Sequence, residues 1–303
     1  MGKNSKHILL IDGENILHQS FHKFEKLKST DGKSSGAIFG FFKSLHMYVN
    51  RLDPDELYIS FDNGHSSIRD ELTPNYKGHR KNISIDYESL QSQKAEIMKI
   101  LKYLRIPYIF DKNKLTNYEG DDFLAYLALR TFKDEKITLI SSDKDFNQLI
   151  SDKLKIFSPR KEEYVRLKNC KEIFGYDPEE TVDYLSLVGD KSDDIEGYPG
   201  MGPVKTRKFL DQYGAIMEYL YQHPEDKKMA EVYHRNKKMI DLRWYIDNVP
   251  LDQEELPIKL YNDGKIKLKK FKEICITYSL ASFLSNNFLK VFTDLNKDRK
   301  SVV

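Results

Sequence analysis

The chain has 303 residues, of which 40% are hydrophobic and 32% charged, and its positive and negative charges nearly cancel to a net charge of +2. This length predicts one large domain or two tightly joined domains, and no apolar run approaches the ~20 residues that a membrane span needs. The cysteines, Cys170 and Cys275, are too few and too far apart for a disulfide framework or a zinc site, which favours a reducing, cytoplasmic location.

Strand and helix patterns alternate along the first half of the chain. Hydrophobic spacing predicts strands at 7–11, 56–61, 107–110 and 137–141, and helices at 36–52, 87–104, 118–132 and 146–150. This alternation predicts an α/β fold with a mostly parallel central sheet flanked by helices. Segments 154–157 and 164–167 form a last strand pair, and we expect mainly helices beyond a boundary near residue 168.

Acidic residues follow three of the predicted strands directly and open the helix at 118–132. Any one of them alone could be a turn former or a helix cap. Ligands of open α/β sheets, however, bind outside the carboxyl ends of the strands. Because several acidic residues occur at such positions, the sequence predicts that they form one acidic site. The residues are Asp12, Asp62, Glu119, Asp121, Asp122, Asp143 and Asp145.

The composition of this acidic set favours a metal centre. Clustered carboxylates stay ionised together only if cations lie between them or their pKa values rise. Oxygen ligands without histidine or cysteine favour Mg²⁺, with Mn²⁺ as a substitute, over zinc. Two such ions about 3.5–4 Å apart suit in-line displacement at phosphorus. The sequence therefore predicts metal-dependent phosphoryl chemistry.

A cationic segment follows the second strand. It contains Arg69, Lys77, Arg80 and Lys81, and beside Lys77 stands Tyr76, whose ring could stack on an unpaired base. Such a segment next to an acidic, metal-filled pocket predicts a polyanionic substrate. The alternative is an ordinary solvated loop.

The loop Gly197–Gly202, followed by a basic helix, fits a helix–hairpin–helix turn. Its glycines let the backbone approach a DNA phosphate closely, while Lys205 and Lys208 add positive charge. A helix-capping turn is the alternative, but the position of the loop after Asp190 and Asp193 favours the DNA-binding interpretation.

Taken in order, these motifs resemble the 5′-nuclease (flap endonuclease) family, which includes the 5′-nuclease domain of bacterial DNA polymerase I. The length and the lysine-rich, apolar C-terminal end are most similar to the bacteriophage branch called ribonuclease H or 5′–3′ exonuclease. The matching blocks are LLIDGEN at 9–15, FDNG at 61–64, RDEL at 69–72, YKGHR at 76–80, YEGDD at 118–122, ISSDKDFNQL at 140–149, VGDKSDD at 188–194 and GYPGMGPVKT at 197–206.

The resemblance implies a PIN-like catalytic α/β domain at 1–168 with a helical arch at about 65–92. It also implies a helical DNA-binding subdomain at 169–303, with a helix–hairpin–helix element at about 185–213 that grips duplex DNA at Gly200 and Gly202, often with K⁺. Lys77 and Arg80 would stand at the base of the arch and act in catalysis with Asp145. The implied metal ligands are the seven acidic residues above together with Asp190 and Asp193, the inner ones being Asp12, Asp62, Glu119, Asp121 and Asp143.

This sequence departs from the family motifs at two positions. Gly120 stands where the family commonly has alanine, a change expected to matter little. Asp194 stands where asparagine is usual, and its extra carboxylate would either alter the affinity for the second metal or face solvent.

The leading hypothesis is a two-metal 5′ nuclease that removes RNA primers or 5′ flaps from duplex DNA during replication, acting as a cytoplasmic monomer. Its expected partners are flapped DNA, RNA–DNA hybrid, and a sliding clamp or single-strand-binding protein contacted through Phe283–Phe292. A haloacid-dehalogenase-type phosphatase would need a second aspartate two residues after Asp12, where Glu14 stands. A non-catalytic DNA-binding accessory protein would not need the intact acidic set.

Overall fold

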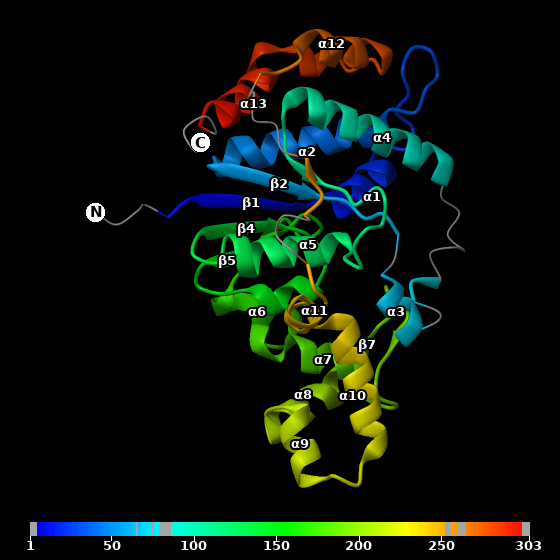
Figure 1. The fold of residues 1–303 in the computed structure, drawn as a ribbon, viewed down its shortest axis with the longest axis vertical. Coiled ribbons are helices and arrows are strands. Elements are labelled where there is room, and N and C mark those ends of the chain that lie inside the picture. Colours follow the sequence, from blue (N-terminus) through cyan, green and yellow to red (C-terminus); the bar gives the residue numbers. More distant parts are fainter. Residues whose placement is uncertain are drawn as a thin grey trace.

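The computed structural model describes residues 5–64, 66–73, 76–78, 86–251, 256–259 and 265–298. Within this part of the chain, seven strands form one sheet in the order β6-β5-β4-β1-β2-β3-β9 (Figure 1). The strands from β5 to β3 are parallel, and β6 and β9 run antiparallel at the two edges. The bounds are β1 His7–Asp12, β2 Glu56–Ser60, β3 Tyr108–Ile109, β4 Lys136–Ile140, β5 Leu154–Ser158, β6 Glu163–Val165 and β9 Ile258–Lys259.

The central strand β1 shows why the sheet lies in the middle of the molecule. Ile8 and Leu10 pack into the hydrophobic core on one face of the sheet, while Leu9 and Ile11 pack into the core on the other face. All four side chains are at most 1% exposed. A parallel strand that is covered on both faces requires such a continuous apolar run. The predicted parallel sheet with helices on both sides is thus confirmed.

The helices on the first face come from both ends of the chain. Asp86 begins α4 by accepting a hydrogen bond from Ser89 N at 2.9 Å. Near the C-terminus, Phe271, Phe283 and Phe292 are buried in the core shared with these helices. The helices are α1 Gly13–Lys23, α2 Gly36–Leu52, α4 Tyr87–Leu104, α12 Leu268–Thr277 and α13 Asn286–Asp298. The predictions for 36–52 and 87–104 are confirmed.

The second face is covered by shorter helices. The helix predicted at 118–132 begins at Gly120, where the Asp122 carboxylate accepts a hydrogen bond from Glu119 N at 2.8 Å. It continues as a π-helical turn, Leu127–Thr131, and the helix predicted at 146–150 is a 3₁₀ turn, Asp145–Leu149. The α-helices of this face are α5 Gly120–Tyr126, α6 Leu167–Phe174 and α11 Leu242–Asn248.

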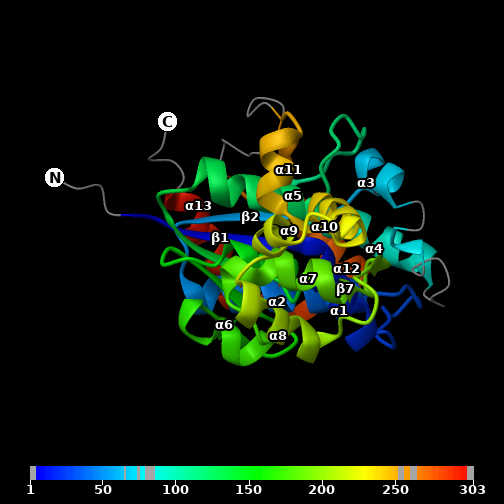
Figure 2. The ribbon, with the colours of Figure 1, turned by 90° about the horizontal axis from the view of Figure 1, so that it is seen from below.

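A helical subdomain extends from one end of the sheet (Figures 1 and 2). It follows α6 in the chain and returns to the sheet through α10 and α11. Helix α3, Ser67–Leu72, lies beside it and contacts α10. The elements are α7 Thr181–Val188, β7 Gly189–Asp190, β8 Ile195–Glu196, α8 Pro203–Tyr213, α9 Ile216–Gln222 and α10 Lys227–Ile240.

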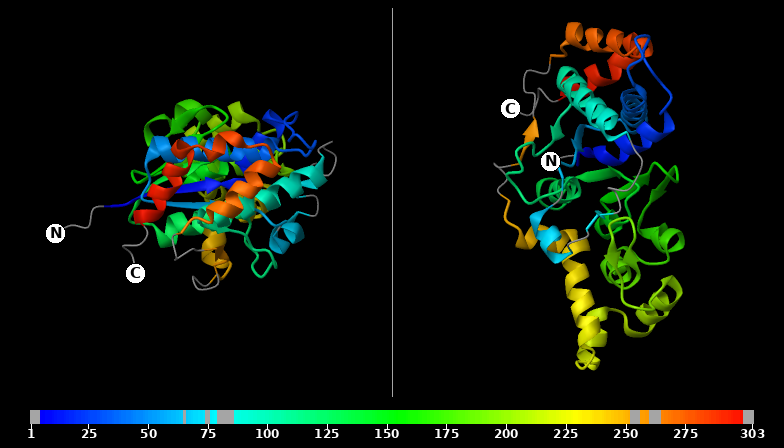
Figure 3. Two further views of the ribbon diagram at one scale, coloured as in Figure 1. Left: turned by 90° about the horizontal axis from the view of Figure 1, so that it is seen from above. Right: turned by 90° about the vertical axis from the view of Figure 1, so that its right-hand side faces the viewer.

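The helices expected in this subdomain, 169–303, do not all lie together in the structure. Helix α11 packs on the sheet, β9 pairs with β3, and α12 and α13 lie at the opposite end of the molecule from α9 (Figure 3). The subdomain ends near residue 240 because the apolar faces of the later helices complete the α/β core. Phe283–Phe292 is therefore a poor tether for a partner, since Phe283, Phe288 and Phe292 are buried. Among the described residues, no helix is long and apolar enough to cross a membrane.

Candidate metal centre

The acidic residues meet where the order of the sheet reverses. Strand β1 pairs with β2 on one side and with β4 on the other, all three parallel. Their carboxyl ends therefore share one edge, so that Asp12, Asp62 and Asp143 gather there. This reversal point is where open α/β sheets bind ligands.

Asp12 is held rigidly at the end of β1. Its Oδ1 accepts a hydrogen bond from Asn15 N at 2.9 Å and caps α1, while its Oδ2 accepts one from Ser141 Oγ at 2.7 Å. Burial, with help from the charges of Asp62 and Asp143, raises the pKa of Asp12 to about 7. The side chain is fixed in place, but without a cation its ionised form is disfavoured.

Asp62 is fixed through contacts that the sequence did not reveal. Its Oδ1 accepts a hydrogen bond from Gly120 N at 2.5 Å. Lys94 Nζ donates to the backbone oxygen of Asp62 and to Glu14 Oε2, each at 2.7 Å. A Cβ atom on Gly120 would lie 2.7 Å from Asp62 Oδ1. The environment of Gly120 therefore argues against the expectation that alanine there matters little.

Asp121, Asp143 and Asp145 complete the cluster. Burial and the charges of Asp12 and Asp143 raise the pKa of Asp121 well above its usual value. Burial and Asp193 raise the pKa of Asp143 to about 6, and burial and Asp143 raise the pKa of Asp145 strongly. In the described part of the chain, Asp145 Oδ1 is buried without a hydrogen-bond partner.

The donor chemistry of the cluster fits a divalent cation. Repelling carboxylates and a buried oxygen without a partner are both relieved by a positive ion. The geometry is not pre-formed, however, because among the described residues no group of three histidine, cysteine or acidic side chains is already arranged as a metal site.

Asp190 and Asp193 reach the cluster from the subdomain. Asp190 is buried, and its Oδ2 lies 3.0 Å from Lys144 Nζ. Lys144 stands between Asp143 and Asp145 in the chain, so this ion pair links the subdomain to the end of β4. Asp193 accepts a hydrogen bond from Lys77 N through its backbone oxygen at 3.1 Å. The structure thus places both aspartates beside the cluster, and their role as ligands stays a prediction.

Glu119 is surrounded by hydrogen-bond donors. Lys77 Nζ donates to its Oε2 at 2.7 Å, Ser66 N donates to its Oε1 at 2.9 Å, and Arg69 Nη1 lies 3.6 Å from Oε2. Burial alone would raise the pKa of Glu119, but Lys77 and Arg69 hold it at about 2. Lys77 itself is buried and has a left-handed backbone with φ of 53°. The predicted catalytic lysine is therefore inside the site.

Asp122 and Arg69 form a buried ion pair, which argues against their predicted roles. Arg69 Nη1 and Nη2 donate to Asp122 Oδ2 and Oδ1 at 2.7 and 2.8 Å. The guanidinium also lies 4.3 Å from the centre of the Tyr245 ring, and both charged side chains are buried. Both Asp122 oxygens are therefore already paired with a buried cation, and Arg69 is buried away from the surface that DNA could reach. The three-residue spacing after Glu119, typical of a capping box, is the signal that could have indicated this.

The position of Tyr76 argues against its predicted role as a stacking residue. Its side chain is buried, and its hydroxyl donates a hydrogen bond to Glu119 Oε2 at 3.2 Å. Arg80, Lys81 and the rest of 79–85 in the expected arch lie outside the described residues, so their assignments stay predictions.

The glycine loop has a backbone geometry compatible with the expected turn. Gly200 has φ of 80°, which favours glycine, and Gly202 directly precedes α8. Lys205 and Lys208 are exposed on α8, as a phosphate-binding role requires. The two-stranded ribbon β7–β8 between α7 and this loop was not expected. Binding of DNA and K⁺ here stays a prediction.

Three supporting residues were missed by the sequence interpretation: Ser141, Lys94 and Lys144. Ser141 and Lys144 lie inside the ISSDKD block, which is a signal that could have indicated them. Lys94 gave no local signal, because it lies in the middle of a helix whose polar residues otherwise resemble a solvated face.

Comparisons with known proteins agree with this fold. The family described as "5′-3′ exonuclease, N-terminal resolvase-like domain" matches residues 7–175, and "5′-3′ exonuclease, C-terminal SAM fold" matches residues 176–273. A 5′-3′ exonuclease of Aquifex aeolicus is 30% identical over 270 residues, which cover 87% of this chain and 91% of the relative. DNA polymerase I of Bacillus caldotenax is 31% identical over 77% of this chain but only 27% of its own length.

Solved structures of low sequence identity share the fold. The bacteriophage T5 5′-exonuclease with bound zinc ions has a TM-score of 0.65 at 20% identity, covering 97% of this chain and all of that one. The bacteriophage T5 flap endonuclease, in a pseudo-enzyme–product complex with DNA and metal ions, has a TM-score of 0.65 at 19% identity with the same coverage. The family matches span most of the chain, and the chain therefore belongs to the 5′-3′ exonuclease family.

Proposed function

We propose that this chain is a divalent-metal-dependent phosphodiester hydrolase that acts as a 5′ to 3′ exonuclease and as a structure-specific flap endonuclease. One observation carries the proposal: Asp12, Asp121 and Asp143 converge at the sheet edge with mutually raised pKa values. Such an arrangement is unfavourable at neutral pH unless a cation is bound. The family membership supports the same reaction class.

The proposed cofactors are two Mg²⁺ ions, for which Mn²⁺ could substitute. When bound, such ions activate a water molecule and stabilise the leaving oxygen. Asp12, Asp62, Glu119, Asp121 and Asp143 would hold one ion, and Asp145, Asp190 and Asp193 would hold the other, partly through water. Asp122 is no longer in this set.

The protein's own contribution is to position these groups and to supply positive charge. Ser141 orients Asp12, and Lys94 holds the backbone of Asp62. Lys77 lies next to Glu119 and could exchange this carboxylate for the scissile phosphate, which would place an ammonium group beside the developing charge. Arg80 is proposed to help at the base of the arch.

The proposed substrate is duplex DNA with a 5′ end or flap, including RNA primers in RNA–DNA hybrid, processed during replication in the cytoplasm. Gly200, Gly202, Lys205 and Lys208 would contact the duplex, with K⁺ in the turn, and Lys81 would contact the single strand. Exposed lysines beside a glycine turn support the duplex contact. A monomer that meets a sliding clamp or single-strand-binding protein remains part of the proposal, without an assigned contact site.

A cleavage assay tests the proposal. Purified full-length chain with Mg²⁺ is incubated with labelled duplexes that carry a 5′ flap of DNA or RNA. We expect short products or cuts near the flap junction, lost in EDTA and in Asp145→Asn. The matched control Asp31→Asn changes an exposed aspartate of a loop and should retain full activity. No cleavage by the unmodified chain, together with tight, salt-sensitive binding, would instead support a DNA-binding accessory protein.

A further inference from the structure

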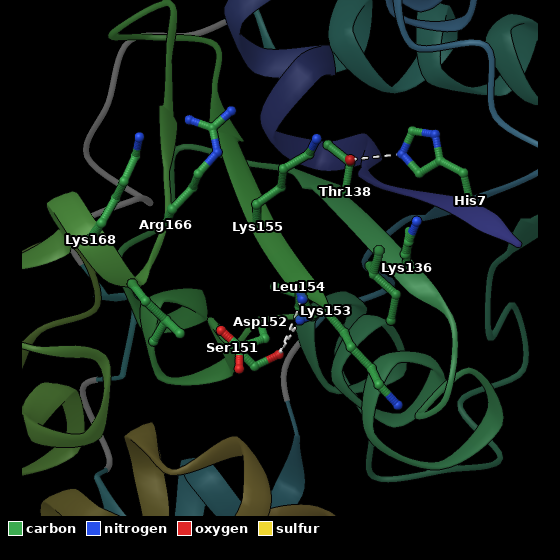
Figure 4. A pocket seen from close by; sticks show the side chains of 12 residues that line it. His7, Lys136, Thr138, Ser151, Asp152, Lys153, Leu154, Lys155, Arg166 and Lys168 are labelled. Atoms are coloured by element: carbon green, nitrogen blue, oxygen red, sulfur yellow. Dashed lines mark hydrogen bonds between the residues drawn. The ribbon is translucent and has the colours of Figure 1, made fainter. Parts of the chain in front are cut away.

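A cavity of about 540 Å³ opens at the edge of the sheet opposite the acidic cluster. It lies at the N-terminal ends of parallel strands, whereas the carboxylates lie at their carboxyl ends. His7 begins β1, Lys136 begins β4, and Lys155 lies on β5, while Arg166 and Lys168 stand at the start of α6 (Figure 4). DNA held at the acidic cluster would have to pass around the whole sheet to reach this cavity.

Among the described residues, the positive charges of this cavity lack carboxylate partners, although Lys155 and Arg166 lie over the ring of Tyr164, 5.1 and 4.5 Å from its centre. In the part of the chain that the structure describes, no carboxylate lies within ion-pair distance of Lys136, Lys155, Arg166 or Lys168, whereas Lys153 pairs with Asp134 at 3.4 Å. In the view of Figure 4, Lys155, Arg166 and Lys168 extend their cationic groups in the same direction.

The pKa values of two of these groups are lowered, as expected for positive charges that lie close together. Burial and the nearby Arg166 lower the pKa of Lys155. Burial and the nearby Lys155 also lower the pKa of His7, whose Nε2 lies 2.8 Å from Thr138 Oγ1. A concave surface with uncompensated positive charge attracts an anion.

The remaining lining shows that the anion should be more than a bare ion. Leu167, which is 36% exposed, supplies apolar surface beside the largely buried Ile137 and Leu154, and Asp152 supplies a carboxylate. Ser151 Oγ accepts hydrogen bonds from two backbone N–H groups, at 3.3 and 3.1 Å, so its own proton is left to donate elsewhere. The volume lies within the range of about 300–1,000 Å³ that is typical of small-molecule sites.

We propose that this cavity binds a nucleoside phosphate. The phosphate would meet Lys155 and Arg166, the flat base would cover Leu167, and a hydroxyl or amino group would donate to Asp152. An acidic peptide would leave the apolar surface and Asp152 without a matched partner. This inference does not depend on the proposed nuclease activity, because the two sites lie at opposite edges of the sheet.

Isothermal titration calorimetry of the full-length chain tests this proposal. EDTA is present throughout, so that metal-mediated binding at the acidic cluster is suppressed. The probes are the four 2′-deoxynucleoside 5′-monophosphates, ATP, inorganic phosphate, a single-stranded oligonucleotide and a glutamate-rich peptide. We expect saturable binding of at least one nucleotide, tighter than that of inorganic phosphate.

Matched variants assign the binding to the cavity. Replacing Lys155 and Arg166 together by glutamine should weaken nucleotide binding about tenfold or more, since each removes a charge-assisted contact. The control double variant Lys269→Gln/Lys272→Gln removes two exposed lysines of α12 and should bind normally. If the first variant does not fold, as judged by circular dichroism, Lys136→Gln/Lys168→Gln replaces it, because both of these side chains are exposed.

Several outcomes would overturn the proposal. These are no saturable nucleotide binding, equal affinity for inorganic phosphate, and nucleotide affinity that is unchanged in the cavity variants. Binding of only the oligonucleotide or only the peptide would also overturn it and would assign the cavity to a second nucleic-acid strand or to an acidic protein partner.

Discussion

Lys77 Nζ lies 2.7 Å from Glu119 Oε2, so a protein cation already neutralises one of the carboxylates predicted to bind metal. The pair is buried, and Arg69 adds a second positive charge 3.6 Å from the same oxygen. Glu119 is therefore ionised at all physiological pH values, unlike the aspartates on the other side of the site. The site combines one compensated carboxylate with several uncompensated ones.

The first prediction concerns Lys77. Replacing it with methionine keeps most of the side-chain volume but leaves Glu119 with a weaker counter-charge. Removing one partner of a buried ion pair typically costs about 3–5 kcal/mol, so urea unfolding in EDTA should show a loss of this order. Single-turnover cleavage at saturating substrate should slow more than duplex binding weakens.

The control for Lys77 is Lys99→Met. Lys99 pairs with Glu96 at 2.6 Å on the surface, where such a pair contributes roughly 0–1 kcal/mol. Equal stability losses in the two variants, or a pure binding defect in Lys77→Met, would contradict the role of Lys77 within the site.

The second prediction separates the neighbouring Asp121 and Asp122. Asp122→Asn should lower the free energy of unfolding by about 3–5 kcal/mol, because Arg69 loses its buried partner. The fraction of this variant that still folds should cleave DNA with the same Mg²⁺ requirement as the unmodified chain. Asp121→Asn relieves repulsion, so stability in EDTA should hold or rise, while stabilisation by Mg²⁺ and cleavage are lost. Urea unfolding with and without Mg²⁺ measures both effects. If Asp122→Asn lost the stabilisation by Mg²⁺ and Asp121→Asn lost stability in EDTA, Asp122 would be the ligand instead.

The acidic cluster shows which parts of the site could be predicted from the sequence. Asp12, Asp62 and Asp143 were predictable because parallel strands bring their carboxyl ends to one edge. The Arg69–Asp122 pair joins residues 53 positions apart, and only the docking of α3 beside α5 brings them together. The local spacing marks Asp122 as a capping residue, but it does not identify Arg69 as the partner of Asp122.

The C-terminal helices show the same limit. The apolar residues of α12 and α13 predict that one face of each helix is buried, but they do not say which surface covers it. The structure packs these helices on α2 and α4. Sequence periodicity thus predicts elements and faces, whereas pairings between distant elements depend on the assembled core.

The third prediction concerns the pH dependence of stability without metal. Folding raises the pKa of Asp12 from 3.8 to about 7 and that of Asp143 to about 6. At a pH between the unfolded and the folded pKa of each residue, the folded state holds a proton that the unfolded state has released. The two carboxyl groups therefore make stability fall as pH rises from about 4 to 7. Because a divalent cation favours the ionised forms, Mg²⁺ should raise the Tm more at pH 8 than at pH 5.

Thermal unfolding in EDTA and in Mg²⁺ across this pH range checks the third prediction. Asp143→Asn removes one titrating group, so its Tm in EDTA should depend less on pH than that of the unmodified chain. A Mg²⁺ effect that is equal at pH 5 and pH 8 would mean that the cluster does not bind the ion through ionised carboxylates.

The fourth prediction uses two neighbouring cations on α8. Lys205 is exposed, whereas Arg207 donates to both oxygens of Glu180 at 2.6 and 2.7 Å. If α8 grips a duplex, Lys205→Ala should weaken binding and reduce the slope of log affinity against log salt by about 1, as the loss of one phosphate contact does. Arg207→Ala should leave this slope unchanged and lower stability instead, because its charge is already paired with Glu180. Fluorescence anisotropy with a labelled duplex over a range of salt concentrations, in EDTA, measures the slopes. The same change of slope in both variants would indicate a diffuse electrostatic effect, and no change in Lys205→Ala would remove this helix from the DNA interface.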